Sequence, residues 1–244
     1  MSMQSAVNKS FGALVYRVGA ALSGLVFPPL CLVCGEPGTP GRDLCAACAA
    51  ALPWLECACR GCALPLPVTE PDGALCGACQ GARSPLAAVH AALLYAAPAD
   101  GLLRRFKFHG DLAAGRLLAQ LMHARLAPVA RPQALVPVPL HLSRLRRRGY
   151  DQALELARPL GRALQLPVLA GLHRTRATPP QSALDAAARR RNLRQAFAAR
   201  GRLPAHVALV DDVMTTGATV QAAARALRRA GVVRVDAWVC ARVP

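Results

Sequence analysis

Two adjacent carboxylates precede a turn rich in hydroxyl groups near the C-terminus. The aliphatic run from Val207 to Val210 predicts a buried strand, and Asp211 and Asp212 follow it directly. A helix is expected to begin at Ala218, so the backbone N–H groups of the turn would face outward and bind a phosphate. Carboxylates beside such a site favour a ligand that also carries hydroxyl groups, such as a ribose, or Mg²⁺. The residues that would form the phosphate-binding turn are Thr215, Thr216, Gly217 and Thr219.

Cysteines form a second group with chemical potential. Nine of the ten cysteines lie between positions 31 and 79, and eight of them form four C-x-x-C pairs. Each pair offers two thiolates from one tight turn, which is half of a tetrahedral zinc site, so the spacing predicts two structural Zn²⁺ ions in a double zinc ribbon. Disulfides are the alternative, but we expect no export signal, and the rest of the chain is poor in cysteine. The pairs are Cys31/Cys34, Cys45/Cys48, Cys59/Cys62 and Cys76/Cys79, and Cys57 is left over.

The charge is distributed unevenly. Residues 1–100 carry five basic and six acidic side chains, whereas residues 101–244 carry 25 basic and seven acidic ones. All the basic residues except Lys9 and Lys107 are arginines, which prefer planar oxyanions such as phosphates. The C-terminal part is therefore expected to meet nucleotides or nucleic acid, although arginines on solvated helix faces are the plain alternative.

Helix-like and strand-like segments alternate from His90 onward, which is typical of a parallel sheet covered by helices. Such a sheet binds its ligands beyond the carboxyl ends of the strands. We therefore divide the chain into an N-terminal amphipathic helix (1–27), a double zinc ribbon (28–84) and an α/β domain (85–244). Strands are expected at 91–95, 134–138, 207–210 and 232–240, and helices at 100–125, 149–164 and 218–230.

The first thirty residues have apolar side chains at intervals of three and four, which predicts the amphipathic helix. It would pack on the rest of the protein, and a membrane-surface anchor is the alternative. The apolar run from Val18 to Leu30 has 13 residues, fewer than the roughly 20 that a transmembrane helix needs. We therefore expect no transmembrane segment and a cytoplasmic protein.

The segment V-A-L-V-D-D-V-M-T-T-G-A-T at 207–219 resembles the phosphoribosyl-pyrophosphate motif of type I phosphoribosyltransferases. Further segments are similar to the ComF family (ComFC/GntX-like proteins), which is linked to natural competence. They are P-V-P at 137–139, R-G-Y-D-Q at 148–152, Thr178 with Gln181, Arg189 with Asn192, Ala196-Phe197, and the four C-x-x-C pairs. The resemblance covers residues 28–243. Asp151 departs from it, since the family more often has Asn there.

The resemblance implies a type I phosphoribosyltransferase-like parallel sheet flanked by helices, preceded by a small double zinc ribbon. It implies that Asp211 and Asp212 bind the ribose hydroxyls, directly or through metal, and that the phosphate-binding turn holds the 5′-phosphate. Lys107 and Arg148 are the candidate catalytic residues, because with Mg²⁺ they would stabilise the departing pyrophosphate. For Lys107 a solvated helix cation is the alternative, and for Arg148 the alternatives are its neighbours Arg144, Arg146 and Arg147.

Three functions follow from these features. The first is a phosphoribosyltransferase that displaces Mg-pyrophosphate from the ribose, with an acceptor that the sequence does not identify. The second is a non-catalytic competence factor that binds single-stranded DNA and keeps the fold for ligand sensing or scaffolding; the third is a structural module. The resemblance implies single-stranded DNA and a competence helicase as partners. We expect a protein that binds phosphoribosyl pyrophosphate and also meets DNA, along a track formed by Arg144, Arg146, Arg147, Arg148, Arg189, Arg190, Arg191 and Arg194.

Overall fold

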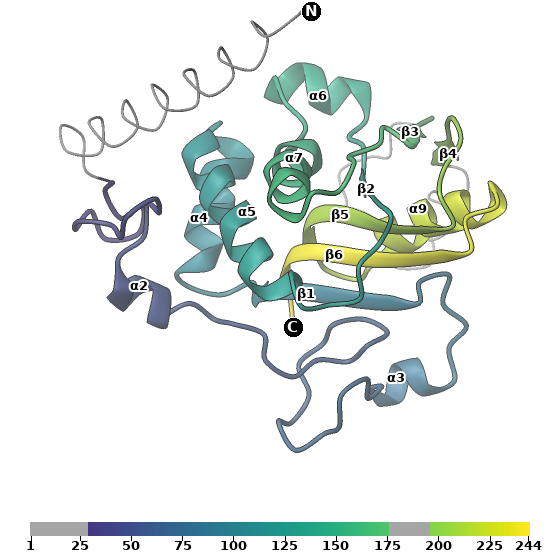
Figure 1. The fold of residues 1–244 in the computed structure, drawn as a ribbon, viewed down its shortest axis with the longest axis horizontal. Coiled ribbons are helices and arrows are strands. Elements are labelled where there is room, and N and C mark those ends of the chain that lie inside the picture. The colour runs from purple at the N-terminus through teal and green to yellow at the C-terminus, as the bar shows by residue number, and fades with distance from the viewer. Residues whose placement is uncertain (1–28, 176–195) are drawn as a thin grey trace, which may run out of the picture. The chain divides into compact units, whose positions relative to one another are not determined.

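A parallel sheet of four strands is the centre of the fold. The computed structural model describes residues 29–175 and 196–244 of the chain. The strands lie in the order β1-β6-β5-β2, and every neighbouring pair in this sheet runs parallel (Figure 1). The expected parallel sheet is therefore confirmed. Its strands are β1 (Ala88–Leu94), β2 (Ala134–Pro137), β5 (His206–Met214) and β6 (Arg234–Arg242).

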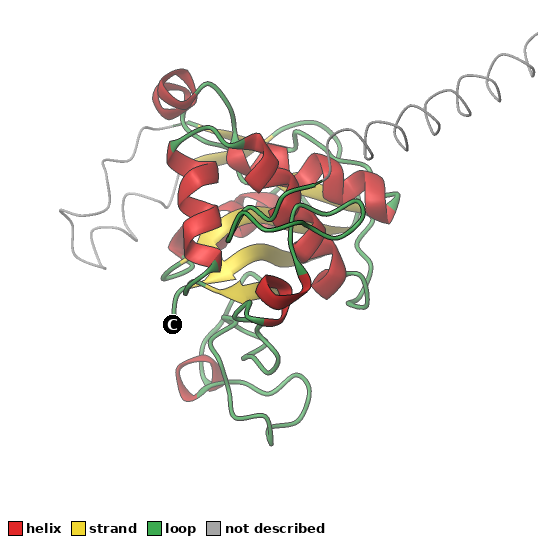
Figure 2. Ribbon diagram, turned by 90° about the vertical axis from the view of Figure 1, so that its left-hand side faces the viewer, coloured by secondary structure: helices red, strands yellow, loops and turns green. Residues whose placement is uncertain are grey.

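Helices cover both faces of this sheet (Figure 2). On one face α5 packs against β1 and β6, α7 packs against β2 and β5, and α4 packs against α5. The other face carries α9, which also contacts a small antiparallel pair, β3 (Leu172–Arg174) and β4 (Phe197–Ala199). The helices are α2 (Ala46–Ala50), α3 (Gly77–Gln80), α4 (Ala99–Phe108), α5 (Leu112–Leu126), α6 (Leu142–Arg148), α7 (Gln152–Leu164) and α9 (Ala218–Arg229).

Alternation of side chains along β5 explains how the sheet serves two layers of helices. Val207 and Leu209 belong to the hydrophobic cluster that contains Leu227 of α9. Ala208 and Val210 are equally buried but point to the opposite face, because successive residues of a strand alternate between faces. The continuous aliphatic run of β5 is thus the pattern expected of a strand buried on both sides.

One predicted helix is wrong in its extent. The stretch from Asp100 to Arg125 forms two helices, α4 and α5, with a break after Phe108. Gly110 takes a left-handed conformation with φ of +68°, and Asp111 starts the second helix by accepting the backbone N–H of Ala114 at 3.0 Å. The break leaves Lys107 in the last turn of α4.

Other elements differ at their ends. The sequence predicts that β5 ends at Val210, but the strand continues through both aspartates to Met214, because Asp211, Val213 and Met214 pair with β6. Helix α6 was not predicted, since three of its seven residues are consecutive arginines at its end and it buries no residue fully.

The chain divides into two compact units between Ala51 and Leu52. The first two C-x-x-C pairs therefore belong to the N-terminal unit, and the last two belong to the same unit as the sheet. The predicted amphipathic helix at 1–27 lies outside the described residues. Among the residues that are described, no helix has the length and apolar character needed to cross a bilayer.

Candidate functional site

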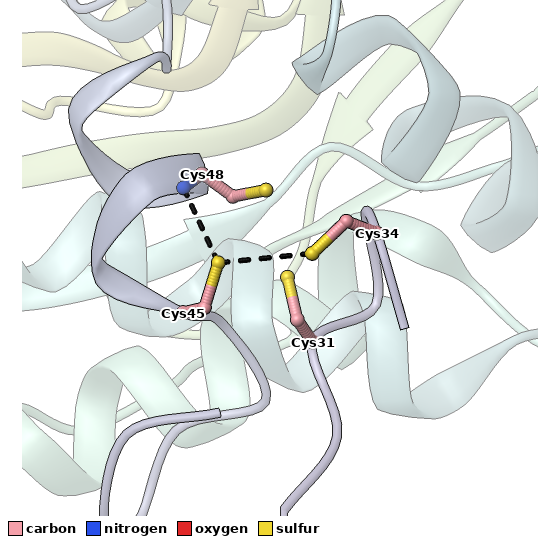
Figure 3. A group of neighbouring side chains, drawn as sticks. All are labelled: Cys31, Cys34, Cys45 and Cys48. Atoms are coloured by element: carbon pink, nitrogen blue, oxygen red, sulfur yellow. Dashed lines mark hydrogen bonds between the residues drawn. The ribbon is translucent and has the colours of Figure 1, made fainter. Parts of the chain in front are cut away.

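Four cysteines of the N-terminal unit gather in one place (Figure 3). The Sγ atoms of Cys31, Cys34, Cys45 and Cys48 all lie within 4.8 Å of one another, and those of Cys34 and Cys45 are 3.7 Å apart. Zinc–sulfur bonds of about 2.3 Å in a tetrahedron place the sulfurs about 3.8 Å from each other. The first two C-x-x-C pairs therefore fit one closed, structural zinc site.

The other two pairs form an equivalent cluster in the larger unit. Cys59, Cys62, Cys76 and Cys79 also have their Sγ atoms within 4.8 Å of one another, with 3.7 Å between Cys62 and Cys76. The pairing is thus first with second and third with fourth, which the sequence left open. Cys57 belongs to neither cluster.

Backbone N–H groups prepare both clusters for a cation. Burial alone raises the pKa of the Cys31 thiol, but hydrogen bonds from the backbone of Cys45 and Cys34 outweigh it and bring the pKa to about 6. In the second cluster the N–H of Cys76 donates to Cys59 Sγ at 3.2 Å, and such bonds bring the pKa of Cys59 to about 7 despite its burial. One thiol of each cluster is therefore favoured as the thiolate that zinc requires, whereas neighbouring sulfurs raise the pKa of Cys48 to about 12 and burial raises that of Cys79.

The segment that carries the second cluster, residues 52–84, is called the second ribbon, and it packs along the edge of the sheet. The N–H of Val89 donates to the carbonyl of Arg60 at 2.8 Å, and the N–H of Leu94 donates to the carbonyl of Pro53 at 2.8 Å. Leu55 and Ala63 of the ribbon are buried in the hydrophobic cluster below α9. The ribbon therefore covers the free edge of β1, which would otherwise expose unpaired backbone groups.

A pocket of about 370 Å³ opens beyond the carboxyl ends of β2 and β5. We call it the Asp211 pocket. Its lining combines Val138 and Pro139 after β2, the end of β5 with the following turn, Lys107 of α4, and arginines of α6. All eight residues predicted to bind ligand or to act in catalysis line it: Lys107, Arg148, Asp211, Asp212, Thr215, Thr216, Gly217 and Thr219.

The two aspartates of the pocket have different surroundings. Asp212 is 8% exposed and its Oδ2 lies 2.8 Å from the Nζ of Lys107. Burial raises the pKa of Asp211 to about 8, with the charge of Asp212 adding to the shift and Lys107 opposing it. The raised pKa of Asp211 lowers the negative charge that this side chain carries near neutral pH, which weakens its repulsion of an anion.

The phosphate-binding turn has the local structure that close approach to an anion requires. Thr215 and Thr216 are exposed, and Gly217 is buried with φ of +73° as the residue preceding α9. The first turn of α9 contains no acidic residue, so its N–H groups and the helix dipole present partial positive charge to the pocket.

Four arginines bring further positive charge to the pocket. Arg144, Arg147 and Arg148 come from α6, and Arg174 comes from β3. Burial lowers the pKa of Arg174, the charge of Arg144 lowers it further, and Asp211 opposes both effects. With Lys107, five cationic side chains and two aspartates line the pocket, which favours a polyanionic ligand.

Arg148 has two neighbours that matter for a ligand. Its Nη1 donates to Oε1 of Gln152 at 2.9 Å, and its guanidinium lies 5.7 Å from the ring centroid of Phe108. Gln152 is 2% exposed and lines the pocket, and its Nε2 has no partner within the described residues. Phe108 is 65% exposed, so part of its ring stays accessible to a planar group beside the Arg148 guanidinium.

Sequence reasoning missed some of these features. It did not single out Arg174, because nothing adjacent to it marks a site, and it assigned no role to Phe108. Asp151 does not line the pocket; its carboxylate accepts the N–H groups of Leu140 and Leu154, so it starts α7. Thr178, Gln181, Asn192 and the predicted arginine track at 189–194 lie outside the described residues.

Comparisons with known proteins agree with this arrangement. The family model described as "Double zinc ribbon domain" matches residues 22–80. "Competence protein F" of Haemophilus influenzae is 38% identical over 159 residues, which is 61% of this chain and 69% of that protein. "DNA utilization protein YhgH" of Escherichia coli is 34% identical over 229 residues, which is 89% of this chain and 99% of that protein.

Two solved structures are similar in part. One is described as the allosteric regulatory enzyme of purine biosynthesis, with a TM-score of 0.36 and 22% identity over 52% of this chain. The other is glutamine phosphoribosylpyrophosphate amidotransferase from B. subtilis, with a TM-score of 0.34 and 24% identity over 52% of this chain. This chain spans a quarter of each structure, and likeness at these scores supports no conclusion about function.

The fold and the sites define a class of protein in which a double zinc ribbon precedes a parallel α/β domain with a cationic pocket. Within that class, the identity and coverage of its relatives place the chain in the ComF family, together with Competence protein F and the YhgH proteins.

Proposed function

We propose that the Asp211 pocket binds phosphoribosyl pyrophosphate together with Mg²⁺, and that the protein serves natural competence through contact with single-stranded DNA. The observation that carries the proposal is the convergence of the motif residues. Lys107, Arg148 and the segment 211–219 come from three distant parts of the chain, and all of them line one pocket. If the motif at 211–219 had no ligand site, there would be no reason for Lys107 and Arg148 to lie in the same pocket.

The chemistry of the lining supports this ligand. The N–H groups and hydroxyls of the phosphate-binding turn suit a 5′-phosphate, and the aspartates suit ribose hydroxyls. The positive charge of Lys107, Arg144 and Arg148 suits a pyrophosphate. Gln152 would donate its buried Nε2, which has no partner within residues 29–175 and 196–244, to the same ligand.

If the protein turns over, an acceptor nucleophile forms a bond to the anomeric carbon of the ribose as the bond to pyrophosphate breaks and Mg-pyrophosphate leaves. Mg²⁺ bound with the substrate would neutralise charge on the leaving group. Asp212 would orient the ribose through its hydroxyls, and Lys107, which is 2.8 Å from Asp212 in the free protein, would exchange that contact for the pyrophosphate. Arg148, which also lines the pocket, would hold the leaving anion.

Titration calorimetry tests ligand binding. Mg-phosphoribosyl pyrophosphate is expected to bind the wild-type chain and, at a hundredfold excess over Kd, to stabilise it by about 2.7 kcal/mol. Asp211→Ala/Asp212→Ala is expected to abolish the heat signal. Asp100→Asn is the matched control, because Asp100 pairs with Arg104 on α4 and does not line the pocket. Equal binding by the double variant would refute the assignment.

A non-catalytic DNA-binding competence factor is the second candidate. The arginines of α6 favour it, because they end a helix beside an exposed aromatic ring, a combination that suits the phosphates and bases of a single strand. Single-stranded DNA binding that persists in Asp211→Ala/Asp212→Ala, without any binding of phosphoribosyl pyrophosphate by the wild type, would favour this candidate.

The cellular setting completes the proposal. A cytoplasmic location and a competence helicase as protein partner are consistent with relatives named for competence and DNA utilization. Co-purification of the tagged protein with that helicase, in the presence and absence of single-stranded DNA, tests the partner. Recovery of the tagged protein in the membrane fraction alone would contradict the location.

A further inference from the structure

A single buried arginine joins the second cysteine cluster to the pocket. Arg242 ends β6 and is 7% exposed. Its Nε donates to the carbonyl of Cys62 at 2.8 Å, and its Nη1 donates to the carbonyl of Met214 at 3.2 Å and to that of Val243. Cys62 lies in the second cluster, and Met214 is the last residue of β5 before the phosphate-binding turn.

Met214 in turn determines where the phosphate-binding turn lies. Its carbonyl accepts a second bond, from the N–H of Val243 at 3.0 Å. Its side chain is buried below Gly217, where a Cβ would stand 2.6 Å from the Cε of Met214. Because the turn follows Met214 directly in the chain, a displacement of the Met214 carbonyl would move the start of the turn.

The charge of Arg242 also suits this place. A zinc ion bound by four thiolates carries a net charge of −2, which would repel a phosphate nearby. Arg242 brings a positive charge next to this cluster, because its guanidinium bonds the carbonyl of Cys62. The guanidinium thus places a positive charge between the cluster and Met214 at the end of β5, since it bonds the carbonyls of both Cys62 and Met214.

We propose that Arg242 is a positioning residue that couples the second cysteine cluster to the phosphate-binding turn, so that an intact cluster is required for full affinity of the Asp211 pocket. This inference rests on the proposed function only for the identity of the ligand. The hydrogen-bonded connection itself concerns the order of the turn and is measured without any ligand.

The test compares Arg242→Met with a matched control. Arg125 also joins the ribbon to the α/β domain, because its Nη2 donates to the carbonyls of Leu55 and Glu56 at 2.7 and 2.8 Å. Arg125 does not contact the phosphate-binding turn and does not line the Asp211 pocket. Arg125→Met therefore removes a similar connection to the ribbon without touching the proposed coupling.

Both variants are prepared as full-length, zinc-loaded protein. Arg242→Met is expected to weaken binding of Mg-phosphoribosyl pyrophosphate at least about tenfold, since it removes charge-assisted bonds that hold the turn. It is also expected to speed amide exchange in peptides covering 210–220. Both variants are expected to lower the melting temperature by similar amounts, because each removes a connection to the ribbon. Arg125→Met is expected to leave the affinity for Mg-phosphoribosyl pyrophosphate and the exchange in 210–220 near wild-type values.

Arg242→Lys keeps the positive charge but cannot bridge two carbonyls in the same way. It is expected to fold even if the Met variant does not, and to show an intermediate affinity and exchange rate. Equal exchange in 210–220 for Arg242→Met and Arg125→Met would overturn the coupling. If the wild type binds no phosphoribosyl pyrophosphate, the proposed function fails, and the exchange comparison still decides the role of Arg242.

Discussion

Loss of the second zinc site should damage the α/β domain, whereas loss of the first should not. Cys76→Ala removes one of four sulfurs from the cluster that belongs to the same compact unit as the sheet. Cys45→Ala makes the same change in the N-terminal unit and is the matched control. Because structural zinc supplies folding free energy, each variant should unfold its own ribbon.

The magnitude follows from what the second ribbon contributes to the sheet. Leu55 is 4% exposed, and full burial of a leucine contributes about 1.5–3 kcal/mol. Ala63 adds about 0.8 kcal/mol for its buried methyl group. The hydrogen bonds of Val89, Leu94 and Arg242 add about 1 kcal/mol each. Some of these contacts will persist, so we expect Cys76→Ala to lower the free energy of unfolding of the α/β domain by about 3–5 kcal/mol.

The assay is chemical denaturation in reducing buffer, followed by the fluorescence of Trp238. This side chain is 1% exposed in β6 and reports on the sheet, and Trp54→Phe in every variant removes the other tryptophan. Metal analysis should give about two zinc ions for the parent and about one for each cysteine variant. Cys45→Ala should keep the denaturation midpoint of the parent. An equal loss of stability in both variants would refute the claim that only the second zinc site stabilises the α/β domain.

Three further predictions concern the pocket. Asp211→Asn should gain stability relative to the wild type as the pH rises from 4 to 8, by at most about 1.4 kcal/mol per pH unit. The reason is that the folded wild type keeps a proton on Asp211, whose pKa is raised to about 8, whereas the unfolded chain releases it. Thermal unfolding at pH 5 and pH 8 measures this, and a stability difference that does not change with pH would contradict the raised pKa. Lys107→Met should lower the free energy of unfolding by about 1–3 kcal/mol, and by less when Asp212→Asn is already present, because Lys107 and Asp212 form an ion pair at 2.8 Å. Strictly additive effects in this double-mutant cycle would argue against the ion pair. Phe108→Ala should weaken single-stranded DNA binding by about 1–3 kcal/mol and leave its salt dependence unchanged. Arg148→Ala, at the residue that lies over the Phe108 ring, should weaken binding and also reduce the salt dependence. A Phe108→Ala variant that binds DNA normally would exclude base stacking at Phe108.

Local signals in the sequence were sufficient for the cysteine clusters and the order of the main elements. Each C-x-x-C pair forms within one turn, so its geometry depends on few residues. The aliphatic runs of β5 and β6 are buried on both faces, and this produces an uninterrupted pattern that is easy to recognise. The acids and threonines of 211–219 line one pocket because a single strand and the helix that follows it place them.

Features that depend on distant contacts could not be predicted. Arg242 and Cys62 are separated by 180 positions in the sequence, so no local pattern connects the ribbon to the end of β5. The break between α4 and α5 depends on the left-handed conformation of Gly110 and on Asp111, which also binds Arg105 at 2.9 Å. The extension of β5 through Asp211 depends on pairing with Val239 of β6, which outweighs the weak strand preference of aspartate.

The most direct measurement of the central claim is a crystal structure of the zinc-loaded protein with Mg-phosphoribosyl pyrophosphate. We expect the 5′-phosphate to accept hydrogen bonds from the backbone N–H groups of 215–219, the ribose hydroxyls to contact Asp211 and Asp212, and the pyrophosphate to contact Lys107. A ligand bound outside the Asp211 pocket, or a pocket that remains empty at saturating ligand, would contradict the account.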